Sequence, residues 1–221
     1  FDFTPAFFIP MGAAILLIDR ASHWSIAAKA GWWLGFGYFL AGLYWLGSAF
    51  LVEPQFIWAM PLAVIGLPVL LALFFAGGFG LAKLLWRPGF MRLFLLAMCL
   101  TWSEALRGSL FTGFPWNSLG MSLGSSVLLA QSASWIGLNG LTFIAVLFFA
   151  APVLWFTEQK RASKFAALGI SAFGFLCLFV FGFYRLAQPI PPSVPDVRLR
   201  IMQPAIAQDE KFSPDQAHKI L

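Results

Sequence analysis

A carboxylate and a guanidinium near the end of an apolar segment are the residues best suited to chemistry in this sequence. Glu104 and Arg107 stand three positions apart, a spacing that puts both side chains on one face of a helix, where they can pair. Ionisable residues in apolar segments are costly unless paired, and an arginine can bind a phosphate through two parallel hydrogen bonds. We therefore expect the pair either to fix a helix end at a membrane interface or to help bind a polar lipid headgroup.

The stretch TGFPWN, residues 112–117, follows the pair and has the composition of a turn. Gly113 permits backbone angles that other residues avoid, and Pro115 favours an extended conformation at Phe114. Aromatic rings such as those of Phe114 and Trp116 are favoured at a membrane interface. The stretch is expected either to anchor the chain at that interface or to form the edge of an opening through which lipid chains enter a site. The candidate lipid-binding residues of this region are Glu104, Arg107, Thr112, Gly113, Phe114, Pro115, Trp116 and Asn117.

The composition indicates a membrane protein. Of the 221 residues, 60% are hydrophobic and only 10% are charged, and the mean hydropathy is +0.83. A soluble domain usually carries about 25% charged residues. The net charge of +5 does not indicate nucleic-acid binding, because the basic residues are scattered over short loops and form no single face.

Other kinds of catalytic or metal site are not indicated. Cys99 and Cys177 each lie inside an apolar run, so they are expected to be small packing residues rather than a disulfide or a metal site. His23 and His218 have no partners at ligand spacing. The sequence contains neither a GxSxG nor an HExxH motif, and no phosphate-binding glycine loop. No metal and no cofactor is expected.

Apolar runs predict an all-α bundle of about six membrane spans within residues 1–187. A spanning helix needs about 20 mostly apolar residues, and the first candidate is short. Pro61 and Pro68 should kink the third candidate, and Gly31 and Gly35 in the second could let a neighbouring helix approach closely. The candidates are Pro5–Ile18, Ile26–Val52, Phe56–Ala82, Met91–Leu106, Trp135–Phe156 and Phe165–Tyr184.

The distribution of Lys and Arg predicts the orientation of these spans. Eight basic residues fall in the loops after the first, third and fifth candidates, and two, Arg107 and Arg185, fall in the alternate loops. Because cytoplasmic loops are enriched in Lys and Arg, the basic loops are expected in the cytoplasm and TGFPWN on the opposite side. With both ends of six spans outside, a further helix before Phe1 is expected if the natural N-terminus is cytoplasmic. The eight basic residues are Arg20, Lys29, Lys83, Arg87, Arg92, Lys160, Arg161 and Lys164.

After the last span the sequence predicts the start of a water-soluble α/β domain. Residues 188–196 hold four prolines and are typical of a stiff linker. In VRLRIM, residues 197–202, apolar residues alternate with arginines, which predicts a half-buried strand. Ser213, Pro214 and Gln216 then predict the start of a helix. One strand and one helix cannot bury a core, so residues 197–221 are expected to be the truncated beginning of the domain.

Three segments resemble bacterial apolipoprotein N-acyltransferases. SEALRGSLFTGFPWNSLG, residues 103–120, is similar to that family's Glu-x-x-Arg-Gly motif followed by Thr-Gly-Phe-Pro-Trp. LRIMQPAIAQDEKF, residues 199–212, resembles the first strand of the family's nitrilase-like domain and the loop after it. FDFTPAFFIP, residues 1–10, is similar to the link that enters the family's second helix. The resemblance covers the whole chain, and the segment 103–120 is its most specific part.

This resemblance implies an enzyme of the bacterial inner membrane with a nitrilase-like domain in the periplasm. The family transfers an acyl chain from a phospholipid to a catalytic cysteine, and then to the α-amino group of a diacylglyceryl-modified apolipoprotein. A glutamate acts as general base, and a lysine stabilises the developing oxyanion. All three residues would lie beyond Leu221, so no catalytic residue is expected in this chain. Gln203 and Phe212, which stands where the family often has Trp, complete the candidate lipid-binding residues.

Two other functions remain open at this point. A membrane scaffold or transporter-like bundle would fit the composition, but transport predicts paired polar residues near mid-membrane, and almost none lie away from the span ends. A membrane-anchored nitrilase-like amidase with another substrate would fit the predicted domain, although the segment 103–120 speaks against it. Residues 1–221 alone are expected to be inactive as an acyltransferase.

Overall fold

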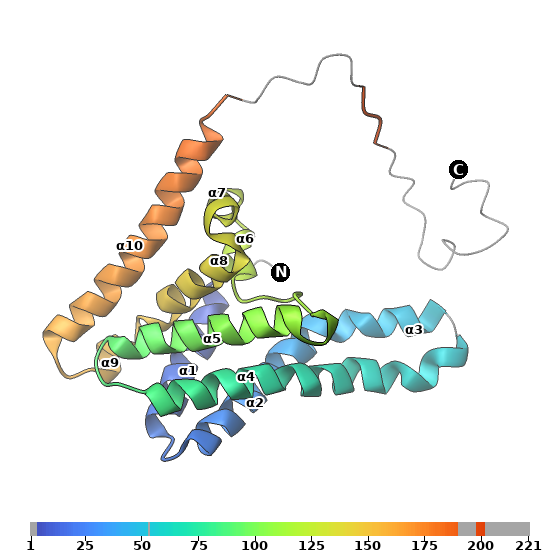
Figure 1. The fold of residues 1–221 in the computed structure, drawn as a ribbon, viewed down its shortest axis with the longest axis horizontal. Helices are drawn as coiled ribbons and strands as arrows, with labels where there is room; N and C mark the ends of the chain where they lie inside the picture. The colour runs from blue at the N-terminus through green and yellow to red at the C-terminus, as the bar shows by residue number, and fades with distance from the viewer. Residues whose placement is uncertain (1–3, 53, 190–197, 202–221) are drawn as a thin grey trace.

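The computed structural model describes residues 4–52, 54–189 and 198–201, and over these residues it is helical without strands (Figure 1). Helices α2, α4 and α5 pack side by side, α5 also packs on α8, and α10 packs mainly against α7, α8 and α9. The α-helices are α1 Phe8–Arg20, α2 Trp24–Leu43, α3 Ala49–Val52, α4 Leu67–Leu85, α5 Met91–Ser109, α6 Met121–Gly124, α7 Val127–Ala130, α8 Ala133–Ala150, α9 Val153–Thr157 and α10 Arg161–Leu186. Short 3-10 turns occupy Thr4–Phe7, Tyr44–Ser48, Pro54–Ala59 and Leu110–Thr112.

Five helical segments of the described chain are long and apolar enough to cross a membrane. The expected first span is helical, but α1 has 13 residues, or about 20 Å at 1.5 Å per residue. A bilayer core is about 30 Å thick, so the expected number of six spans is one too high by this criterion. The five segments are Trp24–Leu51, Gln55–Leu85, Met91–Thr112, Ala133–Ala150 and Arg161–Leu186.

Prolines change the expected helix boundaries at two places. Between Pro61 and Pro68 the third segment forms a π-helical turn, Leu62–Gly66, which is where the expected disturbance of the helix is found. The fifth predicted span, Trp135–Phe156, is divided, because α8 ends at Ala150 and Pro152 precedes the separate α9. The predicted strand is not formed over Arg198–Ile201, and the rest of residues 190–221 lies outside the described residues.

Close packing of α2 on α4 depends on two glycines. A Cβ atom added at Gly31 would lie 2.6 Å from the Cβ of Phe79, and one added at Gly35 would lie 2.7 Å from the Cβ of Phe75. Both phenylalanine rings are fully buried. The expected role of these two glycines in close helix approach is therefore confirmed.

We expect Gly35→Ala to lower the free energy of unfolding by about 1–3 kcal/mol, because the new methyl group overpacks the α2–α4 contact. Gly37→Ala is the matched control on the same helix, since a Cβ there meets no atom within 4 Å. The control is expected to be neutral or slightly stabilising because alanine is the better helix former. Thermal unfolding of the detergent-purified protein measures both, and equal losses in the two variants would contradict the packing explanation.

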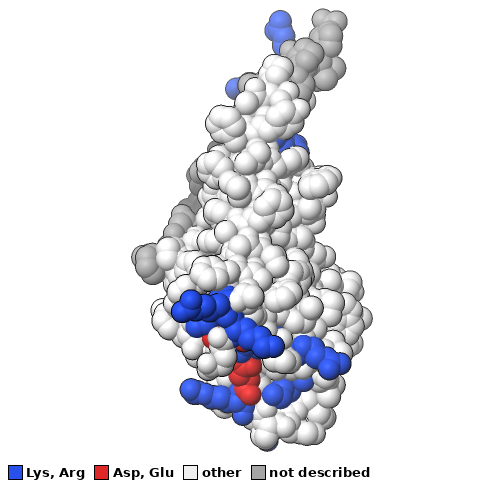
Figure 2. All heavy atoms as spheres, turned by 90° about the vertical axis from the view of Figure 1, so that its left-hand side faces the viewer, with Lys and Arg blue, Asp and Glu red and all other residues white. Residues whose placement is uncertain are grey.

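Basic side chains gather at one end of the molecule, around the turns α1–α2, α4–α5 and α9–α10 (Figure 2). The expectation that the basic residues form no single face is therefore wrong, because the helices bring these separate turns together. Arg92 is buried at this end and donates to Asp19 at 2.5 Å and to Glu158 at 3.0 Å. The indole N–H of Trp86 also donates to Asp19, at 2.7 Å. Arg92 therefore joins the end of α1, the start of α5 and the end of α9.

The carboxylate of Glu158 should make stability at this end pH-dependent. Burial raises its pKa, but hydrogen bonds from the Lys160 and Gln159 backbone N–H groups and the charge of Arg92 outweigh burial and lower the pKa below 4.5. The unfolded chain therefore binds the proton more tightly, so the stabilisation is complete above about pH 4.5 and is lost as pH falls through the lowered pKa. Thermal unfolding of Glu158→Gln should show a lower Tm than the unaltered protein at pH 7. The difference should shrink near pH 3, and a difference that grows on acidification would contradict this.

Candidate functional site

The ion pair of the predicted site lies inside the protein rather than at its surface. Glu104 and Arg107 occupy the last turns of α5, with exposed fractions of 3% and 1%. The Nη2 atom of Arg107 is 3.6 Å from Oε1 of Glu104. The pair therefore lies at the end of α5, as predicted, and helices and loop cover both side chains.

Glu104 ties three parts of the chain together. Its carboxylate accepts hydrogen bonds from the Ser118 hydroxyl at 2.7 Å, the Leu119 backbone N–H at 3.0 Å and the Thr142 hydroxyl of α8 at 3.0 Å. The Thr142 hydroxyl in turn accepts from the Gly120 N–H at 3.1 Å. These contacts attach the loop after TGFPWN to both α5 and α8.

Arg107 binds the backbone of the TGFPWN stretch through its guanidinium group. Its Nη1 atom donates to the carbonyl oxygen of Phe114 and, at 2.7 Å, to that of Trp116. Its guanidinium lies over the Phe39 ring, 5.1 Å from the centroid. The Nε and Nη2 atoms are buried and have no hydrogen-bond partner among the described residues. Of these two atoms, Nη2 is the one ion-paired with Glu104.

The backbone before and within the stretch is strained. Phe111, Thr112 and Gly113 have φ values of 53°, 74° and 82° in succession, and Asn117 has 55°. Positive φ is unfavourable for bulky and β-branched residues, and Phe111 is also 92% exposed. A Cβ at Gly113 would lie 2.2 Å from the Gly108 carbonyl oxygen, so glycine is required there. The sequence predicted the special role of Gly113 but not the strain at Phe111 and Thr112.

Helix α2 supplies contacts that the sequence did not reveal. The Tyr38 hydroxyl donates to the Asn117 carbonyl oxygen at 2.9 Å. The Asn117 amide packs on Gly42, where an added Cβ would be 1.6 Å from Nδ2. Trp45, just beyond α2, stacks on Trp116 with the ring centroids 5.6 Å apart. These partners lie about 70 to 80 residues from the loop in sequence, and no local pattern pairs them.

An apolar cavity of about 610 Å³ lies between α4 and the end of α5. Arg107 is the charged residue in its wall, and the strained residues 111–113 form part of its edge. This volume is within the range of small-molecule sites. The lining residues are Leu67, Leu70, Leu71, Leu73, Phe74, Arg107, Leu110, Phe111, Thr112, Gly113 and Phe114.

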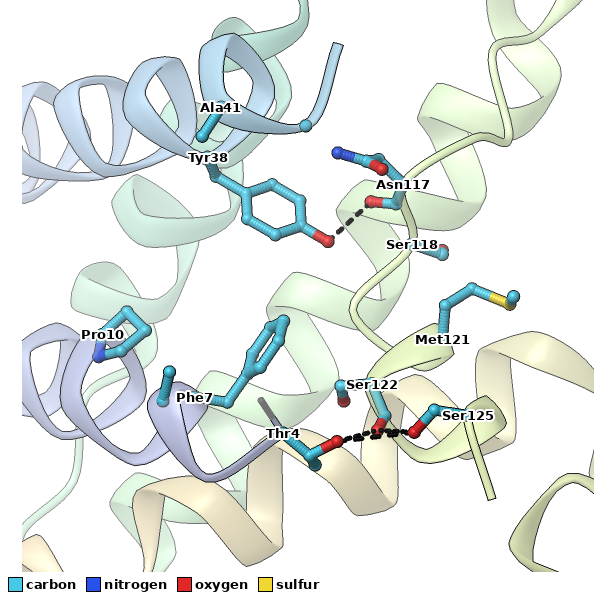
Figure 3. Close-up of a pocket in the computed structure, with 12 residues that line it drawn as sticks. Thr4, Phe7, Pro10, Tyr38, Ala41, Asn117, Ser118, Met121, Ser122 and Ser125 are labelled. Carbon is cyan, nitrogen blue, oxygen red and sulfur yellow. Dashed lines mark hydrogen bonds between the residues drawn. The ribbon is translucent and has the colours of Figure 1, made fainter. Parts of the chain in front are cut away.

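A second cavity, of about 550 Å³, lies on the other side of the loop, between the start of α1, the end of α2 and residues 117–125 (Figure 3). Its wall contains hydroxyl groups, among them those of Tyr38, Ser118 and Ser122. Thr4 donates to the Ser122 carbonyl oxygen at 3.3 Å and lies 3.4 Å from the Ser125 hydroxyl. These hydroxyls already have partners inside the protein, so the wall contains no unpaired buried donor.

The structure thus brings together most of the predicted site. Glu104, Arg107 and residues 112–117 form one connected cluster, with Pro115 and Trp116 exposed. Gln203 and Phe212 lie outside the described residues. Cys99 is buried as expected, whereas Cys177 is exposed on α10, which corrects the prediction that both thiols are packing residues. The described residues contain no group of three His, Cys, Asp or Glu side chains that could hold a metal.

Comparison with known proteins assigns this architecture to a family. Residues 1–151 match the family model described as the apolipoprotein N-acyltransferase N-terminal domain. Three similar curated proteins are named apolipoprotein N-acyltransferase. The one from Rhodopseudomonas palustris is 47% identical over 96% of this chain and 41% of its own length, and the one from Rhizobium meliloti is 47% identical over 84% of this chain and 35% of its own length. The one from Brucella melitensis is 42% identical over 96% of this chain and 42% of its own length.

The chain therefore spans about two fifths of the length of the relatives it matches. Both the family model and the relatives cover the buried Glu104–Arg107 pair and the TGFPWN loop. This helical, membrane-spanning chain belongs to the apolipoprotein N-acyltransferase family, whose N-terminal domain it contains.

Proposed function

We propose that this chain is the membrane part of an enzyme that transfers an acyl chain from a phospholipid to an apolipoprotein, and that the α4–α5 cavity binds the donor lipid. The names of the relatives support the reaction class and the apolipoprotein acceptor. The observation that carries the site is the apolar cavity with the partly unpartnered Arg107 guanidinium in its wall. Apolar walls suit an acyl chain, and a guanidinium in the wall suits an ester or phosphate oxygen of the same lipid.

The covalent steps are assigned to a domain that begins near residue 197. There a cysteine thiolate attacks the acyl ester, forms a thioester and releases a lysophospholipid. The α-amino group of the diacylglyceryl-cysteine then attacks the thioester and regenerates the thiol. The glutamate, lysine and cysteine of these steps would lie beyond Leu221, so residues 1–221 alone should not acylate a lipopeptide. Residues 1–187 would hold the donor, and 188–196 would link the two parts.

The orientation proposed for the site follows from charge. The basic turns and the TGFPWN loop are expected at opposite ends of the bundle. The apolar segment Met91–Thr112, for example, begins after the basic α4–α5 turn and ends at the loop. The rule that cytoplasmic loops are basic would place the Arg20, Arg87 and Arg161 turns in the cytoplasm. With the chain in a bacterial inner membrane, the loop and the domain after residue 197 would then face the periplasm.

Filling the cavity tests the donor site without disturbing the ion pair. Leu70 lines the cavity but is 61% exposed, so Leu70→Trp should fold while reducing the space for an acyl chain. In the full-length enzyme we expect the KM for a long-chain phospholipid donor to rise about tenfold, which corresponds to about 1.4 kcal/mol of binding. The KM for the lipopeptide acceptor should stay unchanged.

Leu62→Trp is the matched control, because Leu62 is similarly exposed on the same apolar segment and does not line the cavity. It should leave both KM values unchanged at normal protein levels. Unchanged donor KM in Leu70→Trp, with a donor of long acyl chain, would reject the α4–α5 cavity as the donor site. Absence of any acyl transfer by the full-length protein would instead reject the proposed reaction.

A further inference from the structure

We propose that the basic end of the bundle is a binding surface for the headgroups of anionic phospholipids, separate from the donor cavity. The surface consists of five exposed cations, which we name the basic ring: Arg20, Lys29, Arg87, Lys160 and Arg161. None of the five side chains makes a hydrogen bond or an ion pair with another described residue. Its ligand is a lipid of the surrounding bilayer rather than a substrate of acyl transfer.

The charge of this end is not neutralised by the protein. Among the described residues, this end has eight Lys and Arg side chains but only two carboxylates, those of Asp19 and Glu158. Its basic residues therefore outnumber its acidic residues by six. Both carboxylates are already occupied, because Arg92 donates to each of them. Backbone N–H groups bind Glu158, and the Trp86 indole binds Asp19. Among the residues that the structure describes, no acidic side chain at this end is therefore left to pair with the basic ring, which leaves its charge available to an anionic ligand.

The positions of the five cations fit a headgroup layer. Four of them lie in or beside the turns α1–α2, α4–α5 and α9–α10, and Lys29 lies near the start of α2. Each of these turns adjoins the end of an apolar segment long enough to cross a membrane. Figure 2 shows these turns forming one charged end on an otherwise largely uncharged surface. A bilayer around the apolar segments would bring lipid phosphates to the same level as the basic ring.

Aromatic side chains at this end mark the same level. Trp24 at the start of α2 and Trp155 in α9 are each nearly half exposed, and the Lys164 ammonium lies 5.6 Å from the centroid of the Trp155 ring. Indole rings are favoured at the boundary between headgroups and acyl chains. A soluble acidic partner or a nucleic acid would not account for these exposed rings beside the cations, whereas an anionic lipid contacts both.

Binding can be measured with the full-length protein in a neutral detergent, using phosphatidylglycerol as the probe and phosphatidylcholine for comparison. Phosphatidylglycerol should raise the Tm at low salt, 1 M NaCl should largely remove the effect, and phosphatidylcholine should have little effect. Neutralising three cations, as Arg87→Gln/Lys160→Gln/Arg161→Gln, should weaken phosphatidylglycerol binding at least tenfold, since each basic residue near an anionic surface contributes a few-fold.

Two control variants separate charge from folding. Arg185→Gln/Arg198→Gln/Arg200→Gln removes the same charge from exposed residues outside the basic end and should bind phosphatidylglycerol normally. Arg87→Lys/Arg161→Lys keeps the charge and should also bind normally. Normal binding by the basic-ring variant, equal effects of the two lipids, or tighter binding of an RNA oligonucleotide than of phosphatidylglycerol would overturn the proposal. The donor-cavity variant Leu70→Trp should leave this binding unchanged, so the two proposals fail independently.

Discussion

Glu104→Ala is expected to lower the free energy of unfolding by about 3–5 kcal/mol, because it leaves the buried Arg107 guanidinium without its counter-charge. It also removes the acceptor for Ser118, Leu119 and Thr142, whose polar groups are buried. A buried donor without a partner costs about 1–3 kcal/mol. Chemical or thermal unfolding in detergent should therefore show one of the largest losses for any single substitution in the bundle.

The double variant Glu104→Met/Arg107→Met distinguishes the buried charge from the lost connections. Replacing both partners of a buried pair by apolar residues is often close to neutral, so the double variant should be more stable than Glu104→Ala. Ser109→Ala, on the exposed side of the same helix end, is the control and should change stability by less than about 0.5 kcal/mol. A double variant that is less stable than Glu104→Ala would mean that the hydrogen bonds to the loop, and not the buried charge, dominate.

Gly113→Ala is expected to cost several kcal/mol and to displace the TGFPWN loop. A φ of 82° costs an L-residue about 1–3 kcal/mol, and the new Cβ would lie 2.2 Å from the Gly108 carbonyl oxygen. The clash is with backbone, so no side-chain rotation relieves it. Because Phe114 donates its N–H to the Arg107 carbonyl oxygen at 2.8 Å, the displacement should separate the loop from α5.

Gly137→Ala separates the two causes. Gly137 also has a positive φ, 66°, but a Cβ there meets no atom within 4 Å, so this variant should show the backbone strain alone. The difference in unfolding free energy between the two variants measures the clash. Protease sensitivity near residue 113 should rise in Gly113→Ala only, and equal behaviour of the two variants would contradict the close approach to Gly108.

The two substitutions should also differ in their effect on acyl transfer. Glu104, on α5, binds the loop and α8 through hydrogen bonds, so its loss is expected to reduce the amount of folded enzyme. Gly113 lines the α4–α5 cavity itself, so folded Gly113→Ala enzyme should bind the phospholipid donor less tightly. Donor KM measured per folded molecule separates these effects.

The helices and their membrane character could be predicted from composition and local order alone. Apolar runs located α2, α4, α5, α8 and α10, because a run of about 20 apolar residues has few alternatives to a spanning helix. The same local information misjudged α1, which has the right composition but only 13 residues, and the end of α8, where Pro152 interrupts the run.

Only part of the candidate site could be predicted from the sequence. Glu104, Arg107 and residues 112–117 are close in the chain, and their residue types conflict with their apolar surroundings, so they stand out. Tyr38, Phe39 and Gly42 could not be found in this way. They are ordinary residues of an apolar helix, and their role comes from contacts with residues about 70 to 80 positions away.

The sequence by itself determined that this is a helical membrane protein, that alternate loops are basic, and that a paired Glu104 and Arg107 precede a turn that needs glycine at position 113. These properties depend on local composition and on neighbours within one helix turn. Only the tertiary structure decided that the pair is buried, that Arg107 keeps unpartnered donors, and that an apolar cavity lies beside it. Burial and cavity shape depend on how α2, α4 and α8 pack around α5, and packing is a property of distant segments together rather than of any one of them.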